Sequence, residues 1–175
     1  MPRVHRVLKA RKAQPGAGIA AGDTYYWWKF RYGGKHVSKT PPKPSQLTQS
    51  EYYGALLTME ENWTTGADRD DAVQAFRSLA EEVESLGSEQ SDKLSNMPDS
   101  LQQGSTGELL QSRADRCEAI AEALNQAADE LEAWTPEESE DTEAEDGAEG
   151  AEPEEDTGWE EEADRLWGDI DWSPE

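Results

Sequence analysis

The sequence is constrained most by the way charge is sorted along it. From Met1 to Pro44 there are ten Lys or Arg residues and one acid, whereas Pro136 to Glu175 holds one base and nineteen acids. Only 34% of the 175 residues are hydrophobic, which is too few for one core over the whole length. We therefore expect three parts: a basic head (1–65), a helical middle (66–135) and an acidic tail (136–175). The expected fold class is α+β and mainly α.

The head contains the run "TYYWWKFRYGGKHVSK", residues 24–39, which predicts a β-hairpin. Large rings favour strands, and Gly33-Gly34 suits a two-residue turn. In that register Phe30 lies opposite Val37 and Trp28 opposite Lys39. Alternation then gives an apolar face, expected to be core, formed by Tyr26, Trp28, Phe30, Tyr32 and Val37. The opposite face carries Tyr25, Trp27, Lys29, Arg31, His36 and Ser38.

This second face has the chemistry of a nucleic-acid-binding surface, because rings stack on bases and cations meet phosphates. The preceding "PRVHRVLKARK" adds more cations, on either a short basic helix or a loose arm. The alternative is an exposed face and a solvated arm that only keep the head soluble. The candidate nucleic-acid-binding residues are Arg3, Arg6, Lys9, Arg11, Lys12, Tyr25, Trp27, Lys29, Arg31 and His36.

Three prolines at 41, 42 and 44 end the predicted ladder and indicate an extended connection. Thr48 to Glu51 then matches a capping box that opens a helix. Its apolar stripe, Tyr52, Leu56, Met59 and Trp63, is predicted to cover the apolar face of the β-hairpin.

The aromatic and basic β-hairpin, with "PGAG" before it and "PPKP" after it, resembles a zinc ribbon without its cysteines. Because those cysteines are the metal ligands, the resemblance implies no metal. The run from Gly22 to Glu51, together with Asn96 to Leu110, is also similar to small uncharacterised proteins of tailed bacteriophages. The similarity covers about two thirds of the chain. It implies a viral or prophage origin and no activity.

The middle part predicts an antiparallel helical hairpin. Asp68 is the expected N-cap of the first helix and Pro98 ends it; Ser105 and Glu108 match a second capping box. From Leu110 an apolar seam repeats every seven residues, formed by Leu110, Cys117, Ile120, Leu124, Ala127, Leu131 and Trp134. Cys117 is read as core, not as a nucleophile. Two helices need a third surface, for which the head helix or a second copy is expected.

Residues 136–158 are predicted to be disordered because like charges repel and apolar residues are sparse. The end of the chain differs, since Trp159, Ala163, Leu166 and Ile170 share one face of a short acidic helix. We expect it to dock on the basic head or on a basic host protein; the alternative is a solvated tail. The candidate partner-binding residues are Trp159, Leu166, Trp167, Ile170 and Trp172.

The sequence shows no apolar run long enough to span a membrane, and a cytoplasmic protein is expected, in the host cell if viral. With one cysteine and no spacing typical of a metal or catalytic site, we expect neither cofactor nor metal and no enzyme. The leading hypothesis is a nucleic-acid-binding adaptor with an acidic regulatory tail. The alternatives are an acidic mimic or inhibitor that docks on a host basic protein, and a structural part of a virus particle.

Overall fold

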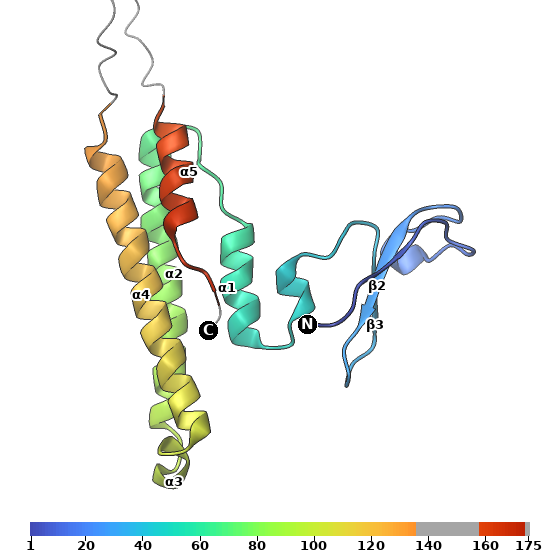
Figure 1. The fold of residues 1–175 in the computed structure, drawn as a ribbon, viewed down its shortest axis with the longest axis horizontal. Coiled ribbons are helices and arrows are strands. Elements are labelled where there is room, and N and C mark those ends of the chain that lie inside the picture. The colour runs from blue at the N-terminus through green and yellow to red at the C-terminus, as the bar shows by residue number, and fades with distance from the viewer. Residues whose placement is uncertain (136–157, 174–175) are drawn as a thin grey trace, which may run out of the picture. The chain divides into compact units, whose positions relative to one another are not determined.

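The computed structural model describes residues 1–135 and 158–173, which form two compact units, 1–62 and 63–173 (Figure 1). The fold is mainly helical with a small antiparallel sheet near the N-terminus, which confirms the expected class. The predicted disorder of residues 136–158 lies, except for Gly158, outside the described residues. The unit boundary falls at Asn62/Trp63, and the second unit joins the helical middle to the end of the predicted tail.

Unit 1 contains a three-stranded sheet in the order β1-β2-β3, formed by His5–Val7, Tyr25–Lys29 and Lys35–Ser38. The 3₁₀ turns Pro15–Ala17 and Pro44–Leu47 and helix α1, Glu51–Glu61, complete the unit. The N-terminal arm is thus neither a helix nor loose in this structure: part of it is β1. Backbone hydrogen bonds continue the β1–β2 pairing outward through Ala10 and Asp23 to Gln14 and Ile19.

The register of β2 against β3 differs from the predicted one. Trp27 lies opposite Val37 and Trp28 opposite His36, so the connection is the five residues 30–34 instead of Gly33-Gly34 alone. Phe30 leaves the ladder, and a Cβ at Gly33 would lie 3.4 Å from the Phe30 Cβ and 3.5 Å from Gln49 Nε2. These local contacts support a wider turn than the Gly-Gly pair suggests.

Helix α1 forms where the sequence predicts a helix, but it begins two residues later than the predicted capping box. Its N-cap is Ser50 and not Thr48, and the Ser50 side chain accepts a hydrogen bond from the Tyr53 backbone N–H. Tyr52 and Leu56 are buried, whereas the helix ends at Glu61, before Trp63. Trp63 therefore does not continue the α1 stripe. It belongs to unit 2.

Unit 2 is built on the antiparallel helices α2, Arg69–Ser95, and α4, Ser105–Ala133, joined through the short helix α3, Asp99–Gln102 (Figure 1). Asp68 caps α2 as predicted, through a 2.8 Å bond from the Asp71 N–H. The second capping box is wrong: the N-cap of α4 is Gly104 and has no side-chain hydrogen bond. The sequence does not reveal α3, against which Gly107 packs so closely that a Cβ would lie 1.9 Å from the Gln102 carbonyl oxygen.

The heptad seam of α4 is buried almost throughout, with Cys117, Leu124 and Leu131 at 0% exposure. The third surface that it needs comes from helix α5, Trp159–Asp169, which packs on α4 and α2 (Figure 1). The expected head helix or second copy is therefore replaced by the end of the chain itself. Trp63 adds to this core, because its ring lies between Phe76, at 4.4 Å, and Trp167, also at 4.4 Å.

Among the described residues no helix is both long and apolar enough to cross a lipid bilayer.

Helices α2 and α4 approach each other closely at Gly87, which gives a first prediction. A Cβ at Gly87 would lie 2.8 Å from the Cys117 Cβ, so Gly87→Ala should force the helices apart. We expect a loss of about 1–3 kcal/mol in the free energy of unfolding, despite the better helix propensity of Ala. Gly168→Ala is the matched control, because nothing lies within 4 Å of its added methyl. Urea unfolding should show the control unchanged or stabilised by up to about 1 kcal/mol; equal effects would contradict this packing.

Docking of α5 gives a second prediction. Leu166 is 5% exposed, so Leu166→Ala should lower the free energy of unfolding of unit 2 by about 2–3 kcal/mol. Leu109, on α4, is 44% exposed, and Leu109→Ala should cost less than about 0.5 kcal/mol. Denaturant titrations followed by helix circular dichroism make the comparison. Similar midpoints for the two variants would mean that α5 does not stabilise the unit.

Candidate nucleic-acid interface

One face of the sheet combines aromatic and basic side chains around Trp27. Strand pairing places Trp27 opposite His5 on one side and opposite Val37 on the other. Because side chains alternate along a strand, the face also includes the residues two positions away from these three. The Trp27 face, as we call it, consists of His5, Val7, Tyr25, Trp27, Lys29, Lys35 and Val37.

The Trp27 ring is held between two neighbours. The His5 ring stacks on it at 4.2 Å between centroids and 9° between planes, and the Lys35 ammonium lies 4.6 Å from its centroid. Since β1 and β3 flank β2, these partners approach from opposite sides. Trp27 can meet a ligand through its outer edge, whereas stacking a base on its ring would require His5 or Lys35 to move.

The predicted candidates separate into four groups in the structure. Tyr25, Trp27 and Lys29 lie together on the Trp27 face, as predicted. His36 lies on the opposite face, where it stacks on Trp28 at 5.5 Å between centroids. Arg31 lies in the turn after β2, with its guanidinium 5.3 Å from the Tyr32 ring centroid. The remaining candidates are exposed residues of the N-terminal strand and its extension: Arg3, Arg6, Lys9, Arg11 and Lys12.

The shift in register explains why His36 was misplaced. It moves β3 by three residues against β2, so every β3 side chain changes face while those of β2 stay. Two members of the Trp27 face, His5 and Lys35, were missed for related reasons. His5 requires β1, whose only sequence signal is the short alternation in "VHRV", and Lys35 requires the observed register.

The cations of unit 1 are largely free of carboxylates. Lys39 pairs with Asp23 at 3.3 Å and Lys43 with Glu61 at 4.0 Å. A backbone N–H from Ala20 and then Lys39 hold the pKa of Asp23 below its usual value. Within residues 1–135 and 158–173, no ion pair engages the other Lys and Arg side chains of unit 1.

The candidate partner-binding residues of the tail face inward instead. Trp159, Leu166, Ile170 and Trp172 are 5–8% exposed, and the half-buried Trp167 stacks on Trp63. In this structure they pack on the helical hairpin of the same unit, which differs from the expected docking on the basic head. Docking on a basic host protein stays a prediction. Apolar burial outweighs the like charge of helix and hairpin, which had argued for a basic target.

Two arginines connect the segment 158–173 to α4. Arg116 binds the Asp171 carboxylate at 2.7 Å and donates to the Asp171 carbonyl and the Ser173 hydroxyl. Arg165 binds Glu162 and Asp169 on its own helix and reaches Glu130 of α4 at 3.9 Å. The excess acid of the segment is thus partly neutralised where it meets the hairpin.

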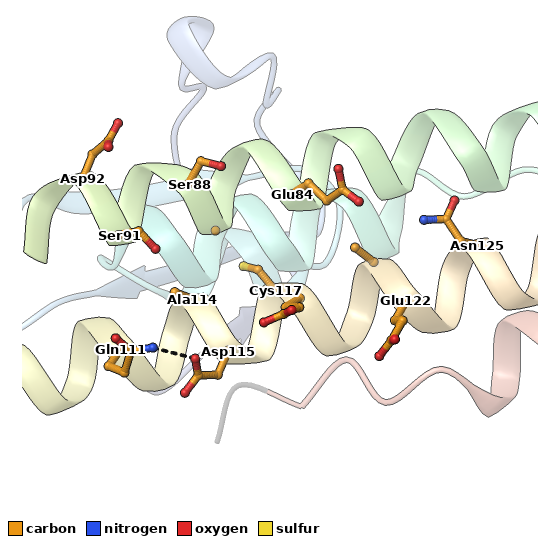
Figure 2. Close-up of a pocket in the computed structure, with 13 residues that line it drawn as sticks. Glu84, Ser88, Ser91, Asp92, Gln111, Ala114, Asp115, Cys117, Glu122 and Asn125 are labelled. Carbon is orange, nitrogen blue, oxygen red and sulfur yellow. Dashed lines mark hydrogen bonds between the residues drawn. The ribbon is translucent and has the colours of Figure 1, made fainter. Parts of the chain in front are cut away.

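An acidic groove of about 670 Å³ lies along α2 and α4 (Figure 2). Figure 2 shows the carboxylates of Glu84, Asp92, Asp115 and Glu122 around it, and the Asp115 carboxylate accepts a 2.6 Å bond from Gln111. Cys117, at its floor, is buried and packs on Gly87. Among the described residues no group of His, Cys, Asp and Glu has the arrangement of a metal site.

Comparison of the chain with protein families, with curated proteins and with solved structures finds no match. The function is therefore argued from the surfaces themselves.

The contact between Arg116 and Asp171 gives a prediction about pH. Arg116, and then two bonds from Ser173, lower the pKa of Asp171 from 3.8 to about 2. A depressed carboxyl pKa stabilises the folded state above pH 3.8, and that contribution is lost as pH falls toward 2. The wild type should therefore be more stable than Asp171→Asn at pH 6, and the difference should vanish near pH 2.

Asp164→Asn is the matched control, since it removes an exposed carboxylate of α5, within the same segment 158–173. Thermal unfolding of the three proteins between pH 2 and pH 6 measures the effect. A difference between wild type and Asp171→Asn that is the same at every pH would contradict the role of this pair.

Proposed function

We propose that the chain is a non-enzymatic, phage-type accessory protein that binds nucleic acid through its basic, aromatic head. The observation that carries the proposal is the Trp27 face, where Lys29 and Lys35 lie opposite each other next to Trp27, and Tyr25 lies two residues before Trp27 on the same strand. A rigid sheet presents such side chains in a fixed arrangement, with rings for base edges or faces and ammonium groups for phosphates.

Electrostatics supports the same proposal. Residues 1–62 hold ten Lys or Arg and four acids, a net charge of +6, in a chain whose total is −23. Lys29 and Arg31 are exposed and lack carboxylate partners within the described residues, which leaves their charge for a ligand. Binding that releases counterions from phosphates should weaken steeply as salt rises.

The proposal includes a regulatory role for residues 136–157, which carry twelve acids and no base. Tethered to the same chain, they compete with nucleic acid for the head at high effective concentration. Truncation at Thr135 would test this poorly, because it would also remove α5 from the hairpin core. Replacing the twelve acids between Glu137 and Asp156 by amides keeps α5, and we expect tighter binding of DNA by this variant at low salt.

Binding of a fluorescent oligonucleotide across salt concentrations tests the proposed function. Lys29→Glu should weaken binding at low salt about tenfold and lower the slope of log affinity against log salt by about 0.7–1. Lys93→Glu is the matched control, with the same change in charge on exposed α2, and should change affinity less than twofold. If the wild type binds neither single- nor double-stranded DNA at low salt, the proposed function is wrong.

A second function is favoured by one observation, the acidic groove along α2 and α4. Residues 63–135 carry sixteen acids and five bases, and rows of carboxylates can stand in for phosphates toward a basic host protein. This alternative predicts no nucleic-acid affinity and a basic partner whose binding is lost when Glu84, Glu118 and Glu122 are changed to Gln. A place in a virus particle stays a further prediction, checked by looking for the protein in purified virions.

A further inference from the structure

A cleft of about 710 Å³ lies within unit 1, beside the Trp27 face. Four parts of the unit form it: the N-terminal residues Met1 and Pro2, the end of β2 with the following turn, the connection from Leu47 to Gln49, and the first turns of α1. Its volume lies within the range of small-ligand pockets. Lys29 belongs both to this cleft and to the Trp27 face, so the two surfaces are continuous.

The inner lining of the cleft is apolar and partly aromatic. Phe30 and Leu47 contribute from the turn and the connection, and Tyr53 and Leu57 lie one helical turn apart on α1. Local hydrogen bonds set where α1 begins: Ser50 Oγ accepts from the Tyr53 N–H at 3.4 Å, and Thr48 Oγ1 accepts from the Ser50 N–H at 3.1 Å. Tyr53 is therefore held at the cleft by a fixed helix start.

The charges of the cleft are of one sign. Lys29 and Arg31 line it, and no carboxylate does among the described residues. A ligand that fits must present a flat or apolar group to Phe30 and Tyr53 and an anion to the two cations. A nucleobase with its phosphate has both, whereas inorganic phosphate or a simple apolar ligand has only one.

We propose that this cleft accepts one unpaired base of a single-stranded nucleic acid, with the adjoining phosphate on Lys29 and Arg31. The inference rests on the proposed function and narrows its ligand to single strands. A base within a duplex is stacked and paired, and it would have to be flipped out before entering. The strand then continues past Lys29 onto the Trp27 face, where Lys35 meets the next phosphates.

The test compares a short single-stranded oligothymidylate with a duplex of the same length, by fluorescence anisotropy at low salt. Wild type should bind the single strand at least tenfold more tightly. Leu57→Glu puts a carboxylate into the cleft and should lower single-strand affinity at least tenfold. The matched control Leu109→Glu, at an exposed site on α4, should change it less than twofold.

Tyr53→Leu provides a second variant that keeps an apolar, helix-favouring side chain and removes the ring. It should lower single-strand affinity about fivefold or more, the range seen when a stacking ring is lost, with the helix circular dichroism unchanged. Equal binding of single strand and duplex, with both cleft variants like wild type, would overturn the cleft and leave the proposed function standing. Binding of neither nucleic acid would overturn both.

Discussion

The second unit depends on the contact between the apolar stripe of α5 and the helical hairpin. Two antiparallel helices bury only one stripe each, and here Leu166, Ile170 and the tryptophans of residues 159–172 supply the missing third surface. Each such side chain contributes about 1.5–3 kcal/mol on burial, whereas repulsion between exposed like charges is mostly below about 1 kcal/mol. An acidic helix therefore docks on an acidic hairpin, with Arg116 and Arg165 bonded at the contact.

The same contact occupies the aromatic residues at the end of the tail. Within the described residues, the Lys and Arg side chains of unit 1 have only Asp23 and Glu61 as ion-pair partners. The aromatic rings and most of the acids of the tail therefore lie in different segments of it. The rings stabilise unit 2, and in the proposed function the acids of residues 136–157 are the charge that competes with a nucleic acid.

Local signals predicted the helices well and the sheet poorly. Asp68 fixes the start of α2, and the seven-residue repeat through Cys117 and Leu124 identifies the buried face of α4, since both signals lie within a few turns. The predicted capping box at Ser105 is wrong because α3 occupies the connection. The expected docking of α5 on the head was wrong because the charge of α5 was weighed above its apolar stripe. Both outcomes depend on contacts between distant parts of the chain, and the periodicity of the sequence gives no information about such contacts.

The candidate nucleic-acid interface also could be predicted only where local signals determine it. Alternation within β2 places Tyr25, Trp27 and Lys29 on one face whatever β2 pairs with, so these three follow from sequence alone. Which β3 side chains join the Trp27 face depends on the length of the turn. A shift of β3 against β2 by an odd number of residues removes His36 from this face and brings Lys35 and Val37 onto it. His5 enters only through β1. The exchange matters for the proposed function, because Lys35 and His5 lie against the Trp27 ring. The surfaces proposed to meet a base are then the edge of that ring, Tyr25 and the cleft beyond Lys29.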